Sequence, residues 1–528
     1  GLNTEGNFNT AVGTLALESN TTADDNVAVG KSALCKNTTG SNNVAVGAAS
    51  LDANTTGANN TAVGKDALGA NTTGAYNTAL GVETLDANST GERNTGLGAG
   101  ALTDNTTGCY NIGVGYGSLA NNTTANDNVA VGYFSLEANT TGTQNVAVGS
   151  CTLCTNTTGD LNVAIGCLAL LANTTADENT AIGSVAMCTN TTGAKNTAIG
   201  TAAMCKNTTG GDNAALGHSS LNDNTTGASN VSVGSETLYK NTTASNNTAV
   251  GKQALYTNTT GASNVAVGSE ALKSNTTAAG NTAIGASALT TNTTGSALVA
   301  IGANAMYANT TGNSNTAIGR SALSNNTTGA SNVSVGAFSM NDNTTGANNT
   351  AIGRGSLDAN TIGNYNVSVG MDSLTSNSNG EENVAVGNEA LCKNSTAGCN
   401  TAVGLQSLFN NTTGHSNTAV GRKSLHAMST GDCNVAVGYQ AGDITNTGDN
   451  NHSFGYDSNP SSNSVSHEIT LGNGANNNLR CADTSISSLS DLRDKTNIED
   501  IPHGLDYILA MRPVKFDWNT RDGTRIGK

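Results

Sequence analysis

The side chains best able to do chemistry are 11 cysteines and six histidines, and their spacing limits what they can do. Five cysteines are separated from one another by multiples of 17 residues, the distance from Cys188 to Cys205. We therefore expect them to occupy the same solvent-side position of a repeat. Cys188 and Cys205 are a single interval apart and within disulfide range. No pairing scheme recurs, which favours free thiols in a reducing cytosol. The five are Cys35, Cys154, Cys188, Cys205 and Cys392.

Other catalytic and metal-binding arrangements are not evident in the sequence. Cys151-x-x-Cys154 has no second pair of ligands placed to complete a four-coordinate zinc site. The histidines are scattered, no phosphate-binding loop occurs, and no acidic pair recurs as glycoside hydrolysis requires. We therefore expect no cofactor, no metal ion and no enzymatic activity in the repetitive part of the chain.

The triplet Asn-Thr-Thr is the third feature with a chemical interpretation. It is an N-glycosylation acceptor in form, and it occurs at Asn20, Asn37, Asn54 and most later repeats. The alternative is that the triplet recurs because a turn of the fold needs it. The regular spacing favours the turn.

Composition excludes several classes of protein. Among 528 residues only 11% are charged and 3% are aromatic, while Gly is abundant (64) and Pro is scarce (3). Too few large side chains are present for a thick globular core, and no apolar run is long enough to span a membrane. A net charge of −16 makes a nucleic-acid partner improbable. These features are typical of a thin, repetitive β-rich protein.

A 17-residue repeat organises nearly the whole chain. Glycines at a constant interval from Gly13 to Gly438 mark 26 coils without an insertion, and Gly455 and Gly472 continue the count in two degenerate coils. The consensus is N-(T/V)-A-(V/I)-G-x-x-(A/S)-L-x-x-N-T-T-G-x-x, and its letters define positions one to 17 of a coil. Such strict periodicity predicts an all-β parallel β-solenoid, or β-roll, of roughly 130 Å at about 4.8 Å per coil.

Each position of the coil has an expected structural role. Asn-Val-Ala-Val, as in 43–46, predicts a short strand, and the Gly that follows turns the chain. Position nine is Leu or Met in every coil from Leu17 to Leu425 and should fill the middle of the stack. The Asn of Asn-Thr-Thr-Gly should form a ladder of side-chain amides between coils.

The strand is apolar on both faces, and a single thin coil can cover only one of them. We expect a second subunit to cover the other face, with the small Ala at position three allowing close approach of the two backbones. Segments such as 42–50, Asn-Asn-Val-Ala-Val-Gly-Ala-Ala-Ser, resemble the head repeat of trimeric autotransporter adhesins (YadA-like heads). That resemblance implies a homotrimer, although those heads have shorter coils and lack the Asn-Thr-Thr-Gly turn.

The composition changes near the C-terminal end. From Ser490 onward 14 of 39 residues are charged, and the only Trp, Trp518, lies there. We expect a regular rod over 1–455, degenerate coils and a connector over 456–489, and an α+β domain over 490–528.

Ser490-Asp-Leu-Arg-Asp-Lys495, with the later Arg512-Pro-Val-Lys-Phe-Asp-Trp518, resembles the start of the intramolecular chaperone domain of phage endosialidases, tail spikes and tail fibres. The resemblance implies a domain that trimerises, guides folding of the stalk and cuts itself off between Leu489 and Ser490. Ser490 would then be the nucleophile and Lys495 the general base, since a serine needs an adjacent base. Asp491 and Arg493 would support the site.

The competing interpretation of this segment is an ordinary helix start capped by Ser490. The resembling domain also continues beyond the point reached at Lys528. We therefore expect a truncated chaperone domain in a piece of a longer fibre, with self-cleavage uncertain in this piece.

The sequence thus predicts a structural or adhesive fibre, the stalk of a phage tail fibre or tail spike that takes part in host attachment as a part of the virion. The partners would be two further copies of the chain and a host-cell receptor or polysaccharide. The alternative is the stalk of a bacterial trimeric surface adhesin, exposed outside the cell. An ice-binding solenoid and a polysaccharide-degrading enzyme rank lower.

Overall fold

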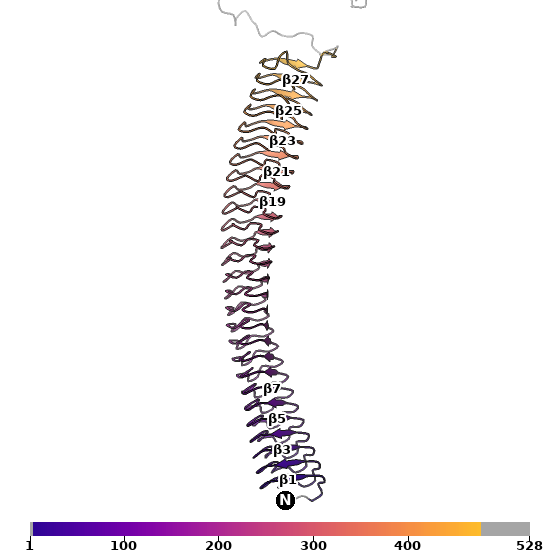
Figure 1. The fold of residues 1–528 in the computed structure, drawn as a ribbon, viewed down its shortest axis with the longest axis vertical. Coiled ribbons are helices and arrows are strands. Elements are labelled where there is room, and N and C mark those ends of the chain that lie inside the picture. The colour runs from indigo at the N-terminus through magenta and orange to yellow at the C-terminus, as the bar shows by residue number, and fades with distance from the viewer. Residues whose placement is uncertain (1–3, 477–528) are drawn as a thin grey trace, which may run out of the picture. The chain divides into compact units, whose positions relative to one another are not determined.

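The computed structural model describes residues 4–476, which form one stack of coils with a single three-residue strand in each (Figure 1). This confirms the all-β parallel solenoid, and no helix occurs within the described range. The strands are β1 (Thr10–Val12), β2 (Val27–Val29), β3 (Val44–Val46), β4 (Thr61–Val63), β5 (Thr78–Leu80), β6 (Thr95–Leu97), β7 (Ile112–Val114), β8 (Val129–Val131), β9 (Val146–Val148), β10 (Val163–Ile165), β11 (Thr180–Ile182), β12 (Thr197–Ile199), β13 (Ala214–Leu216), β14 (Val231–Val233), β15 (Thr248–Val250), β16 (Val265–Val267), β17 (Thr282–Ile284), β18 (Val299–Ile301), β19 (Thr316–Ile318), β20 (Val333–Val335), β21 (Thr350–Ile352), β22 (Val367–Val369), β23 (Val384–Val386), β24 (Thr401–Val403), β25 (Thr418–Val420), β26 (Val435–Val437), β27 (His452–Phe454) and β28 (Ile469–Leu471).

Every strand pairs in parallel with its counterpart in the next coil, so equivalent positions lie directly above one another. In β3 and β4, for example, Val44 is opposite Thr61 and Ala45 is opposite Ala62. Backbone hydrogen bonds continue outside the strands, as from Leu51 N–H to the Ala67 carbonyl (3.0 Å). Because the whole coil is bonded to its neighbours, three residues per strand suffice for a stable sheet.

The interior contains one large side chain per coil. The position-nine residues from Leu34 to Leu408 are fully buried, as predicted, and pack among the alanines of position three. Their backbone is left-handed, with φ 52° at Leu255, for example. A left-handed backbone is a poor fit for side chains branched at Cβ. This explains why the position holds Leu or Met and never Ile or Val from Leu17 to Leu425.

The position-five glycines bring the backbones of successive coils into close contact. Gly251 has φ +125°, and a Cβ on it would lie 2.6 Å from the carbonyl oxygen of Gly268. The position-15 glycines differ. A Cβ on Gly261 would also crowd a carbonyl, 2.2 Å away, but no positive φ is needed there. Six coils already carry Ala at this position, so a small shift of the backbone accommodates it: Ala23, Ala125, Ala176, Ala244, Ala278 and Ala397.

One expectation about the strand faces is wrong. The small residue of position three does not lie at a surface for a second subunit, since it faces inward and is fully buried in coils such as that of Ala45. The outward residues are the Val, Ile, Leu and Thr of positions two and four, which are partly exposed in most coils, as at Val44 and Val46. The inward-facing residue of the strand is small because the position-nine side chain already fills the space beneath the strand.

The two kinds of glycine should respond differently to the same substitution. Gly251→Ala should destabilise the fold by about 3 kcal/mol or more, because it combines backbone strain with a clash between backbones. The matched variant Gly261→Ala should lose about 1 kcal/mol or less. Urea denaturation followed by circular dichroism measures both, and equal losses would contradict the distinction.

Branching at Cβ should matter more than volume at position nine. Leu255→Ile should lose about 2 kcal/mol, because a β-branched residue is strained at a left-handed backbone. Leu255→Met keeps an unbranched Cβ and should lose less than about 1.5 kcal/mol. Thermal unfolding of the two variants decides the point, and a well-tolerated Ile would refute it.

Candidate functional site

The most extensive exposed feature is the outward face of the sheet, which we call the outer stripe. It consists of the residues at positions two and four of the 26 coils whose strands run from β1 to β26. Position four is always Val, Ile or Leu, and position two is Thr, Val, Ile or Ala. No charged residue interrupts the outer stripe over this length. Such a surface can bury apolar area against a partner without desolvating any charge.

Exposure of the outer stripe is substantial in the single chain. At position four, Leu80 is 46% exposed, Leu216 is 48% and Ile284 is 39%. The residues on either side of the outer stripe include charged and aromatic side chains that stack from coil to coil. Arg93, for example, lies over the rings of both Tyr76 and Tyr110, at 5.6 and 5.4 Å from their centroids. The outer stripe is therefore an uncharged face of mainly Val, Ile, Leu and Thr with a varied polar rim, as in many protein interfaces.

The Asn-Thr-Thr turns are built from hydrogen bonds between coils, which confirms the predicted ladder. Asn54 Nδ2 donates to Asn37 Oδ1 (2.9 Å) and to the Gly57 carbonyl (2.9 Å). Thr55 donates to the Thr72 carbonyl from its Oγ1 (3.0 Å) and its N–H (2.9 Å). Both amide protons of the buried Asn54 are thus used, which leaves no room for a glycan in the folded coil. The recurring triplet is explained by the turn.

A second asparagine ladder was not anticipated. Position-one Asn43 accepts the backbone N–H of Asn60 on its Oδ1 (2.9 Å) and donates from Nδ2 to the Gly57 carbonyl (2.9 Å). The same carbonyl accepts the amide of Asn54, so the two ladders meet at one oxygen. The signal was present in the sequence, as an Asn before nearly every strand, but such a residue is also common in simple turns.

The cysteines of position ten, predicted to lie on the solvent side, are partly exposed, while Cys167, Cys399 and Cys433 are exposed. Burial, and next the neighbouring Glu137, raise the pKa of the Cys154 thiol to about 12. Within residues 4–476 no three His, Cys, Asp or Glu side chains are grouped to hold a metal ion. In the same range no helix is long and apolar enough to cross a membrane.

The residues predicted to cut the chain, Leu489 with Ser490, Asp491, Arg493 and Lys495, lie outside the described residues, as does the α+β segment. Comparison with known families finds that residues 490–527 match a family model described as the chaperone of endosialidase. No curated protein matches the chain. A β-solenoid followed by this match is what a tail fibre-like or tail spike-like protein would contain.

One interruption of the first asparagine ladder leaves polar atoms unpaired. Met428 stands at position 12, between Asn411 and Thr445 of the neighbouring coils. Asn411 Oδ1 and Thr445 Oγ1 are buried without a hydrogen-bond partner. An Asn at 428 would offer an amide N–H to the first and a carbonyl oxygen to the second.

Met428→Asn should therefore stabilise the protein, by about 1 kcal/mol, because it pairs two buried oxygens. Met428→Leu is the matched control, because it keeps an apolar side chain at position 12 and offers no hydrogen bond to Asn411 Oδ1 or Thr445 Oγ1. The control should give no gain, and denaturant midpoints compare the two. A destabilised Met428→Asn protein would show that the lost apolar contact outweighs the new hydrogen bonds.

Proposed function

We propose that the chain is the stalk of a trimeric fibre, in which the outer stripes of three copies pack against one another along the rod. The observation that carries the proposal is the uncharged outer stripe, unbroken over 26 coils. The number three is supported by the chaperone-of-endosialidase match at 490–527 and by the resemblance to trimeric adhesin heads.

The fibre is proposed to belong to a phage tail fibre or tail spike that attaches the virion to its host. The chaperone match favours this setting over a bacterial surface adhesin, whose stalk would use the same kind of repeat. In this proposal the rod has a structural role. Its C-terminal segment gathers three chains, guides their folding and then cuts the bond between Leu489 and Ser490.

The trimer is tested by placing charges on the outer stripe. Light scattering of the unmodified chain should give about three times 52.6 kDa. The double variant Ile284→Asp with Ile318→Asp should lose the trimer, since each copy would bury unpaired carboxylates in the interface. Both side chains are more than a third exposed in the single chain, so the coil itself should tolerate the change.

The control for this experiment places the same charges in the same two coils, on the exposed turn. Thr294→Asp with Thr328→Asp should remain trimeric, because these side chains are exposed and lie away from the outer stripe. A monomeric unmodified chain, or a trimer that survives the outer-stripe charges, would overturn the proposed assembly.

Self-cleavage is tested in the complete reading frame that contains this chain. Ser490→Ala and Lys495→Ala should each leave one uncut band, because they remove the proposed nucleophile and its base. Ser488→Ala, two residues upstream, should be cut normally. Cutting that persists in Ser490→Ala would exclude this residue as the nucleophile, and cutting in neither the natural protein nor the variants would exclude the reaction.

A further inference from the structure

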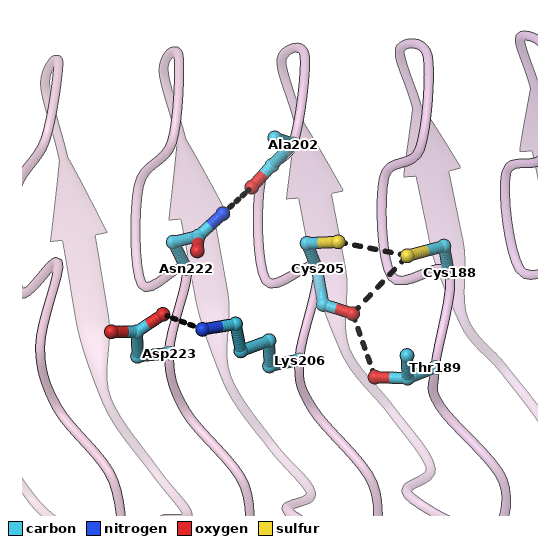
Figure 2. Close-up of polar contacts among 7 residues, drawn as sticks. All are labelled: Cys188, Thr189, Ala202, Cys205, Lys206, Asn222 and Asp223. Atoms are coloured by element: carbon cyan, nitrogen blue, oxygen red, sulfur yellow. Dashed lines mark hydrogen bonds and ion pairs between the residues drawn. The ribbon is translucent and has the colours of Figure 1, made fainter.

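Cys188 and Cys205 occupy position ten of two adjacent coils and their thiols touch (Figure 2). The Sγ atoms are 2.8 Å apart, against about 2.05 Å in a disulfide. Other position-ten cysteines face different partners. Cys35 contacts Glu18 (3.6 Å), and Cys154 contacts Glu137 (3.5 Å). A weaker interaction joins Cys154 to Cys151 within one coil, whereas Cys188 and Cys205 meet across two coils.

The backbone on both sides of the pair is held at the spacing a disulfide needs. Met187 N–H donates to the Ala203 carbonyl (3.0 Å), and Thr189 N–H donates to the Cys205 carbonyl (3.2 Å). Thr189 Oγ1 reinforces the second bond at 2.7 Å. Coils bonded in this way lie about 4.8 Å apart, inside the 4.4–6.8 Å range of Cα separations in disulfides. The bond can therefore form with little movement of the coil.

We propose that Cys188 and Cys205 are a redox modification site, at which a disulfide oxidant such as oxidised glutathione closes a covalent staple between two coils. One cysteine thiolate attacks a sulfur of the oxidant and displaces one glutathione thiolate. The second cysteine attacks the resulting mixed disulfide and displaces the other. The protein loses two protons and two electrons, and the oxidant is reduced to two thiols.

The surroundings favour a staple over other uses of the pair. No third His, Cys, Asp or Glu within residues 4–476 joins the two thiols to form a metal site. Burial, and next the contact with Cys205, raise the pKa of the Cys188 thiol to about 12. Once the coils have stacked, little of the Cys188 thiol is in the reactive thiolate form near neutral pH, so the staple closes slowly. The neighbouring Lys206 forms an ion pair with Asp223, with its Nζ atom 2.8 Å from Asp223 Oδ1.

The consequence of the staple is local. It links residues one coil apart in the sequence, so the stack cannot separate between these two coils without breaking a covalent bond. The site lies on the far part of the coil from the strand, so it works in a single chain and does not depend on the proposed trimer.

A peptide map tests the proposal directly. The full chain is incubated with oxidised glutathione, its remaining thiols are alkylated in denaturant, and trypsin is added. Cleavage after Lys195 and Lys206 releases residues 196–206, whose one cysteine is Cys205. This peptide should vanish from the non-reducing map and return on reduction.

Two variants show whether Cys188 is the cysteine that is joined to Cys205. In Cys188→Ser, peptide 196–206 should stay free, and in Cys392→Ser, which removes another position-ten cysteine, it should still be cross-linked. Oxidation should raise the unfolding temperature of the unmodified chain and not that of Cys188→Ser. A peptide that stays free or carries only glutathione in the unmodified chain would overturn the proposal. So would one that remains cross-linked in Cys188→Ser.

Discussion

The close approach of successive backbones at the position-five glycines is the constraint on which the rest of the structure depends. At these residues φ lies in a range that L-amino acids rarely adopt, and a Cβ would meet the next coil's backbone, as for Gly251 and Gly268. Once this contact fixes the spacing between coils, every other position falls into a ladder with its counterparts. The sheet, the stack of position-nine side chains, both asparagine ladders and the outer stripe all depend on this constant spacing between coils.

Ladders of this kind make each coil dependent on its neighbours. An asparagine is satisfied only if the next coil presents the matching group, so a single departure leaves atoms unpaired above and below, as Met428 does for Asn411 and Thr445. Leu298 is a second such departure, since it takes from the Asn315 N–H the asparagine oxygen that serves this position in other coils, as Asn332 Oδ1 does for the Asn349 N–H (3.0 Å). The same proximity that penalises Met428 brings Cys188 and Cys205 into contact. Irregular positions in a regular rod are therefore the places where chemistry or instability is concentrated.

Periodicity made the fold predictable, since coil length, strand position, the column of Leu255-like residues and the ladder of Asn54-like residues all follow from spacing. The direction of the strand faces did not follow, because Ala and Val are both apolar and alternation alone cannot say which is inside. That choice depends on how much room the position-nine side chain leaves, which is a property of the folded coil. The role of Asn43 was missed because an Asn before a strand has a simpler local explanation. The predicted residues Ser490 and Lys495 rest on resemblance, and they lie outside the described residues.

Regularity also creates a problem for the proposed trimer, and the end of the rod suggests its solution. Sliding one chain by the length of a coil places Val, Ile or Thr against Val, Ile or Thr along the outer stripe, so the sequence penalises a slipped register very little. Among the strands of residues 4–476, β27 alone departs sharply, with His452 and Phe454 at positions two and four. This change comes in the last coils of the rod, on the side of the chain that leads to the chaperone match. A domain that gathers three chains there would act where the sequence distinguishes one register from another. Assembly that starts at this end and proceeds toward β1 would carry a single register through coils that cannot specify it themselves.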